Sequence, residues 1–178
     1  FEKIKKLKFI NIKKNIGFGH GVMQGLKSSK GKFIGYTHAD HQTDPMDFNK
    51  CIKKINTMSN KKIFLKGYRK NKLNCGWSLF DVFLTSSQTI VQSFLLGTFM
   101  HDIHSQPNVF SRSLLNYKKM YPKDFQIDTY FYYLAKKNNF EIIKFDVIFN
   151  KRFRGYGEGN NDSFLKKIKG IILHLIGS

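Results

Sequence analysis

The stretch from Asn15 to Pro45 constrains the fold of this chain more than any other. It opens with a glycine-rich turn, whose residues permit positive φ and close backbone approach, and continues into a short helix over about 21–29. An apolar strand at 33–37 follows and ends in the polar run His38-Ala39-Asp40. Because open α/β sheets bind ligands beyond the carboxyl ends of their strands, this run predicts a site.

Strands and helices alternate along the rest of the chain. Hydrophobic periodicity predicts further strands at 7–12, 63–65 and 141–149, and helices at about 45–58, 112–119 and 126–138. Asp44 is expected to cap the helix that starts at Pro45, with Phe48, Ile52 and Ile55 on its apolar face. The alternation is typical of an α/β fold with an open, mostly parallel sheet flanked by helices. We expect one domain over residues 1–178 that ends in an amphipathic helix at about 162–176.

Two interpretations are open for the segment from Trp77 to about Phe99. Its apolar residues recur at helical spacing, while Asp81, Gln88 and Gln92 fall on the other side. In the first interpretation the apolar side packs on the sheet as one or two helices. In the second the segment is an amphipathic helix that lies at a membrane surface.

The composition excludes several classes of protein. A chain of 178 residues with 41% hydrophobic residues and 18 phenylalanines is expected to bury a core, which argues against disorder. No continuous apolar run reaches the roughly 18–20 residues that span a bilayer. Cys51 and Cys75 provide neither a disulfide framework nor a four-ligand metal site, so we expect a reducing, cytoplasmic setting.

The formal net charge of +19 raises the question of nucleic-acid binding. The lysines, however, are scattered along the whole chain, which indicates a general compositional bias rather than a binding stripe. We therefore expect no nucleic-acid partner, and a weak attraction to anionic membranes or phosphorylated substrates instead.

The few arginines are more informative than the many lysines. A guanidinium binds phosphate through two parallel hydrogen bonds, which an ammonium group does not do. Where lysine is so abundant, a site that needs only positive charge has no use for arginine. The arginines are therefore candidate phosphate ligands: Arg69, Arg112, Arg152 and Arg154.

Several motifs together resemble the family 2 glycosyltransferases of the GT-A fold, notably their dolichol-phosphate mannose synthase-like, polyprenyl-phosphate branch. Asn15-Ile-Gly17-Phe-Gly19 is similar to the Asn-x-Gly-x-Gly of that branch, and Gly25 to Gly31 is similar to its next glycine motif. His38-Ala-Asp40-His-Gln42-Thr-Asp44-Pro45 resembles its aspartate-rich metal motif. The resemblance covers roughly residues 10–160 in the family's order.

Three further motifs continue the resemblance downstream. Gly67-Tyr-Arg69 is similar to the family's Gly-Ser-Arg, and the segment from Asp102 to Arg112 resembles its acceptor segment. Phe149-Asn-Lys-Arg152-x-x-Gly155 is similar to its late Arg-x-x-Gly. The resemblance implies an inverting hexosyltransferase with a Rossmann-like fold, whose donor is a UDP- or GDP-linked sugar. The implied acceptor is a polyprenyl phosphate or a cell-surface glycan precursor at the inner face of the membrane.

The resemblance also assigns roles to residues. Asp40, assisted by His38, is implied to bind a divalent cation, Mn²⁺ or Mg²⁺. The nucleotide sugar is implied to contact Asn15, Gly17, Gly19, Gln42 and Arg154. The implied catalytic residues are Arg69, Arg112 and Arg152, which hold an acceptor phosphate, and Asp102. Asp102 is the candidate base if the acceptor is a hydroxyl, and a turn-capping residue otherwise.

The chain departs from the family pattern at two places. His38 stands where the family has aspartate, which favours Mn²⁺ because Mg²⁺ prefers oxygen ligands. The family's opening βαβ unit, which holds the nucleotide base and ribose, has no counterpart, so we expect a domain truncated at its N-terminus. The alternatives are a noncatalytic remnant or membrane-associated binding module of the same fold, and a nucleotidyltransferase, which leaves the late arginines unexplained.

Overall fold

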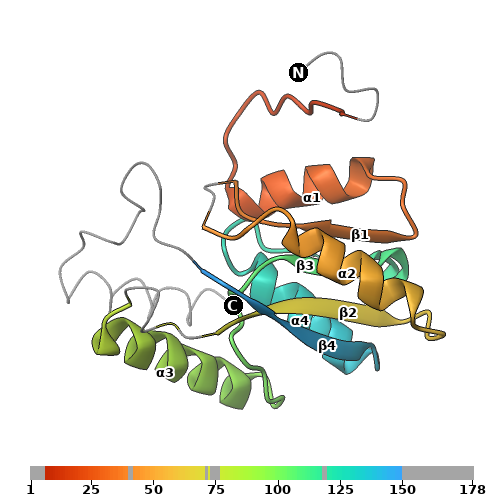
Figure 1. Ribbon diagram of the computed structural model, residues 1–178. Helices are drawn as coiled ribbons and strands as arrows, with labels where there is room; N and C mark the ends of the chain where they lie inside the picture. The colour runs from red at the N-terminus through yellow and green to blue at the C-terminus, as the bar shows by residue number, and fades with distance from the viewer. Residues whose placement is uncertain (1–6, 40–41, 71, 73–76, 118–119, 150–178) are drawn as a thin grey trace.

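The computed structural model describes residues 7–39, 42–70, 72, 77–117 and 120–149. The elements follow one another in the order α1 (Phe18–Ser28), β1 (Phe33–Tyr36), α2 (Asp47–Asn56), β2 (Ile63–Arg69), α3 (Leu79–Leu95), β3 (Asn108–Ser111), the 3₁₀ helix η1 (Arg112–Tyr117), α4 (Ile127–Lys137) and β4 (Glu141–Val147). This is the predicted α/β arrangement of a sheet flanked by helices (Figure 1). The segment at 162–176, predicted as an amphipathic helix, lies outside the described residues.

The four strands lie in the order β1-β3-β2-β4. Strand β2 pairs in parallel with β4, and β3 pairs antiparallel with both β1 and β2. Three strands therefore share one direction, and the reversed strand is β3, which the sequence did not predict as a strand. It runs backwards because α3 and the turn after it return the chain to the edge of the sheet at which β2 ends.

Two apolar clusters occupy the two faces of the sheet. Strand β2 contributes to both because successive side chains point to opposite faces: Phe64 belongs to one cluster, and Ile63 and Leu65 to the other. Helices α1 and α4 cover the Phe64 face, and α2 covers the opposite face. The predicted inward face of α4 is confirmed, with Ile127, Phe131 and Leu134 buried.

The inward face of α2 differs from the prediction. Phe48 and Ile55 pack against the sheet as expected, but Cys51 is buried between them and Ile52 is 54% exposed. Asp44 does not cap the helix, because its Oδ1 accepts a hydrogen bond of 2.8 Å from the N–H of Met46 within the preceding turn.

The predicted strand at 7–12 is wrong. These residues have no strand conformation, and Leu7, Phe9 and Ile10 are exposed. A period-two pattern forms a strand only where a neighbouring strand accepts its hydrogen bonds. Among the described strands, β1 and β4 form the two edges of the sheet, and neither pairs with this segment.

Helix α3 packs with the side opposite to the predicted one. It is a single helix that continues through Ser87, and Figure 1 shows it to one side of the sheet rather than over the face that α2 covers. Gln92 and Ser93 are buried, and Ser93 Oγ accepts a hydrogen bond of 2.9 Å from the N–H of Met100. Phe83 is 66% exposed and Phe94 84% exposed. The interpretation in which the apolar side packs on the sheet is therefore wrong. None of the helices in the described ranges is long and apolar enough to cross a bilayer.

Two glycines of α1 provide a matched test of its packing. A Cβ on Gly19 would lie 2.6 Å from Asp124 O and even closer to Pro122 O, whereas a Cβ on Gly25 meets nothing within 4 Å. We predict that Gly19→Ala destabilises the protein by about 1–3 kcal/mol, because the rigid 122–124 backbone must move. Gly25→Ala should stabilise it by about 0.5–1 kcal/mol, because alanine loses less backbone entropy in a helix. Urea unfolding measures both, and equal effects would contradict this packing.

Candidate active site

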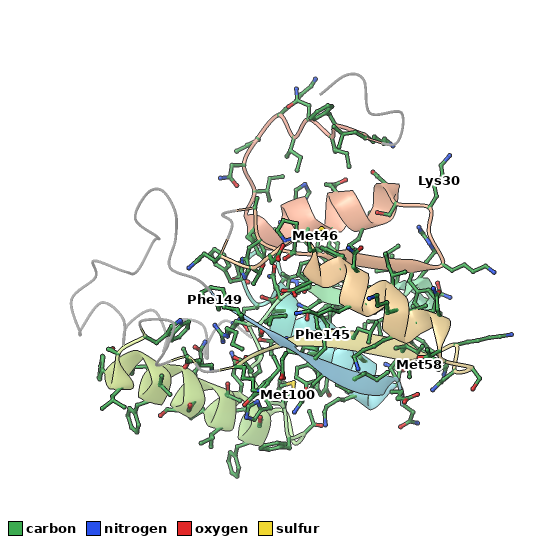
Figure 2. The ribbon with its side chains drawn as sticks, in the orientation of Figure 1. Lys30, Met46, Met58, Met100, Phe145 and Phe149 are labelled. Carbon is green, nitrogen blue, oxygen red and sulfur yellow. The ribbon has the colours of Figure 1, made fainter. Side chains whose placement is uncertain are left out.

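The carboxyl ends of β1, β2 and β4 meet at one edge of the sheet, at the left of Figure 1. His38 follows β1 at this edge, Arg69 is the last residue of β2, and Phe149 lies two residues beyond β4. Figure 2 shows Phe149 beyond the end of that strand, away from Phe145 in its middle. Because β3 runs in the opposite direction, the turn that begins at Asp102 and leads into β3 lies at the same edge.

A buried ion pair joins β2 to this turn. Asp102 Oδ2 accepts a hydrogen bond of 2.8 Å from the backbone N–H of Arg69, and its Oδ1 accepts bonds from Nε of the same arginine, at 2.9 Å, and from Nη2. Lys72 Nζ lies 3.2 Å from Oδ1. Arg69 is 7% exposed and Asp102 4% exposed. The two predicted residues are thus brought into direct contact.

The surroundings of Asp102 make it a weak base. Burial alone would raise the pKa of its carboxyl group, but the Arg69 guanidinium, its hydrogen bonds and the charge of Lys72 together hold that pKa well below the usual range. Both carboxylate oxygens are already occupied by donors. The arrangement therefore suits a residue that orients Arg69 better than one that accepts a proton.

Two aromatic rings complete the surroundings of Arg69. Its guanidinium carbon lies 5.0 Å from the centre of the Trp77 ring and 5.5 Å from the centre of the Phe149 ring. The ring of Phe149 also lies edge-on to the imidazole of His38, with 5.9 Å between the ring centres. One aromatic side chain therefore links the strand that carries the metal motif to the ion pair of Arg69 and Asp102.

The metal motif is only partly within the described residues. Asp40 lies outside them, and so do Arg152 and Arg154. The described part of the chain holds no group of three or more His, Cys, Asp or Glu residues able to bind a metal. His38 supplies one imidazole at the correct edge of the sheet, and such a donor fits Mn²⁺ better than Mg²⁺. Gln42 is half-buried in the same loop, which Thr37 and Thr43 close with a contact of 3.2 Å between their hydroxyl oxygens.

The glycine-rich turn packs against protein backbone. Asn15 Oδ1 accepts a hydrogen bond of 3.0 Å from the N–H of Gly17, whose φ of 126° favours glycine. Gly17 and Gly19 lie against the backbone of residues 122–124, as the space around their missing Cβ atoms shows. The structure gives these glycines a packing role, and their contact with a nucleotide stays a prediction.

Arg112 does not lie in this site. It follows β3 at the opposite edge of the sheet, where its Nε donates a hydrogen bond of 2.8 Å to Gly31 O and its Nη2 another to Ser29 O. The seven residues of β2 separate the two edges by roughly 20 Å at about 3.3 Å per residue. Sequence order alone had grouped Arg112 with Arg69.

A buried polar network beneath the ion pair was not predicted. Asp128 on α4 accepts a hydrogen bond of 2.7 Å from the hydroxyl of Tyr36 and others from the amides of Gln106 and Asn108. Lys66 on β2 is 1% exposed and donates to Asn108 Oδ1. The signal in the sequence was a lysine within an otherwise apolar strand, three residues before Arg69.

Comparison with protein families agrees with this architecture. The model of glycosyl transferase family 2 matches residues 1–138, which is most of the chain. A mixed sheet flanked by helices, with a metal-motif strand and an arginine–aspartate pair at one edge, is the arrangement to which that match applies. The chain belongs to glycosyl transferase family 2 and is a glycosyltransferase.

The buried pair predicts a specific pH dependence of stability. Asp102→Asn should destabilise the protein by about 3–5 kcal/mol at pH 7, because it leaves the buried Arg69 without its counter-charge. A lowered pKa in the folded state means that the contribution of Asp102 is fully present above its ordinary value of about 3.9 and is lost as the pH falls below it. The stability gap between wild type and Asp102→Asn should therefore narrow below about pH 4.

Urea unfolding at several pH values measures this gap. Asp146→Asn is the matched control, because Asp146 pairs with Lys70 on the exposed surface and should affect stability little. A gap that stays constant down to pH 2 would show that Asp102 is not the charged partner of Arg69.

Proposed function

We propose that this glycosyltransferase moves a hexose from a nucleoside diphosphate sugar to a phosphate-bearing lipid acceptor, with inversion at the anomeric carbon. The observation that carries the proposal is the Arg69–Asp102 pair, which lies at the carboxyl edge of the sheet beside His38. Family membership supports glycosyl transfer in general. The pair supports the choice of acceptor.

Arg69 retains the donors that an acceptor phosphate needs. A guanidinium has five N–H groups, and Asp102 takes one from Nε and one from Nη2. Three remain, in the fixed plane that Asp102, Trp77 and Phe149 impose on the group. Arg152 and Arg154 follow Phe149 closely in the sequence, and we assign them to the phosphates of the acceptor and the donor.

The low basicity of Asp102 favours a phosphate acceptor over a hydroxyl acceptor. A hydroxyl must lose a proton to a base as it attacks, and a carboxylate whose pKa is held low and whose oxygens are occupied is a poor one. A phosphate monoester is already ionised near neutral pH, since its second pKa is about 6. It attacks without a base, so orientation by Arg69 is sufficient.

Asp40 and His38 are the residues that would hold a divalent cation. Such an ion neutralises the charge that builds up on the departing diphosphate. Gln42, in the loop that Thr37 and Thr43 close, is assigned to the donor. Asn15, Gly17 and Gly19 then shape the edge of the donor pocket through their packing rather than by direct contact.

A transfer assay on the full-length protein with UDP- and GDP-sugars, Mn²⁺ and a polyprenyl phosphate tests the proposal. Asp40→Asn should abolish Mn²⁺-dependent transfer, because the amide is a weaker ligand and carries no charge. Glu141→Gln makes the same chemical change at the opposite edge of the sheet and should leave the rate unchanged. Full activity in Asp40→Asn would remove this residue from the mechanism.

Calorimetry on the same proteins separates transfer from simple binding. A wild-type protein that binds the nucleotide sugar with Mn²⁺ but transfers nothing would be a binding module of the same fold. Transfer to a hydroxyl acceptor in preference to the lipid phosphate would overturn the assignment of Arg69 and Asp102.

We also propose that the exposed apolar side of α3 rests on the cytoplasmic membrane surface, as a peripheral contact. Phe83 and Phe94 face outward, while polar Gln92 and Ser93 attach the helix to the domain. A helix that turns its apolar side away from its own core has that side available for the hydrocarbon boundary of a bilayer. The net charge of +19 adds a general attraction to anionic lipids.

Vesicle binding measures this contact. Phe83→Ser with Phe94→Ser should weaken binding to phosphatidylglycerol-containing vesicles by at least about tenfold, because two large apolar side chains are lost from the contact. Met120→Ser is the control, since Met120 is 88% exposed and lies outside α3. Equal binding by the double variant and the control would contradict the assignment of this surface.

A further inference from the structure

The side chain of Lys66 is a buried cation in the middle of the sheet. It is 1% exposed and lies on β2, which also carries Arg69. Lysine is almost never fully buried unless it is paired, because its charge loses the stabilisation of water. The fold core does not need such a residue, since its neighbours Phe64 and Leu65 are both apolar and completely buried.

The three donors of the Lys66 ammonium group are matched by three acceptors. Nζ donates to Ile103 O at 2.7 Å, to Ser105 O at 2.8 Å and to Asn108 Oδ1 at 3.3 Å. It also lies 5.2 Å from the centre of the Tyr132 ring, on whose face a cation is stabilised. The group is therefore fully coordinated, and two of its partners are backbone carbonyls.

These two carbonyls belong to the turn that carries Asp102. The N–H of Ser105 donates to Asp102 O at 3.0 Å, which closes the turn, and Asp102 has a positive φ of 50°. Gly67 lets the next residues lie directly on β2, because a Cβ there would come within 2.6 Å of Gln106 O. The turn is thus held by β2 at two points: Lys66 binds its carbonyls, and Arg69 binds its carboxylate.

We infer that Lys66 is a positioning residue of the acceptor site, whose charge fixes the 102–105 turn and so orients Asp102 against Arg69 for binding the acceptor phosphate. The inference rests on the proposed function in so far as Arg69 contacts that phosphate. Lys66 itself touches no substrate and acts only through Asp102 and Arg69.

The charges around Lys66 make this role dependent on pH. Burial lowers the pKa of Lys66 to about 8. Asp128 on α4 and Asp102 in the turn favour the charged form, whereas Arg69 on β2 and Lys144 on β4 oppose it. The charge is present at pH 7. Above about pH 8 a neutral amine has only two N–H donors for three acceptors.

Lys66→Met tests the inference by keeping the length of the side chain and removing its charge. We expect the KM for the acceptor to rise by at least about tenfold, because the oriented Arg69 fork loses charge-assisted support. The KM for the nucleotide sugar should stay within about twofold of wild type, because the donor motif lies on β1. Lys144→Met is the matched control, since Lys144 pairs with Lys66 in the sheet register but is exposed.

The single tryptophan gives a second readout that does not depend on activity. Trp77 lies against the Arg69 guanidinium, so a displaced Arg69 changes its emission. We expect a shifted emission spectrum in Lys66→Met and none in Lys144→Met. If Lys66→Met does not fold, wild type alone supplies the test: its emission and its acceptor KM should change together through about pH 8.

The possible outcomes are distinct. An unchanged Trp77 emission with equal changes in both KM values would make Lys66 a purely structural residue and overturn the inference, and so would a wild-type emission that is flat through pH 8. If wild type transfers no sugar at all, the proposed function fails, and the Trp77 emission still decides whether Lys66 positions Arg69.

Discussion

The ion pair between Arg69 and Asp102 is the interaction on which the arrangement of this edge depends. It connects the last residue of a central strand to a turn that otherwise has no regular secondary structure. A buried pair of this kind adds little net stability, because desolvation offsets most of the attraction, but it fixes geometry. The rings of Trp77 and Phe149 then leave the guanidinium one orientation, which is what recognition of a phosphate requires.

Helix α3 shows how the same sequence pattern serves two environments. Its attachment to the domain is polar, through Gln92 and Ser93, and its free side is apolar. A protein that works only in water gains nothing from this arrangement, because each exposed phenylalanine loses the benefit of burial. The position of α3 directly after Trp77 places the proposed membrane contact next to the proposed acceptor site, where a lipid phosphate would arrive.

The sequence predicted the elements better than it predicted their neighbours. Strands β1, β2 and β4 follow from apolar runs between breaks, whereas β3 has four residues and too little pattern to identify. Periodicity revealed the two sides of α3 but not which side faces inward, since the polar side carries amides and hydroxyls that bury well once hydrogen-bonded. The contact of Arg69 with Asp102 followed from motif order. The position of Arg112 did not, because its edge depends on the direction of β3.

The central place of β3 has a consequence for how the chain assembles. Within the described sheet, β1 is bonded only to β3, and Tyr36 meets Asn108 across 72 residues of sequence. As the polypeptide leaves the ribosome, β1 emerges long before its partner and remains without a hydrogen-bonded neighbour until β3 has been made. Pairing over such separations is slow. The metal-motif strand is therefore expected to join the sheet late, and a newly made chain exposes an unpaired strand edge that chaperones can recognise.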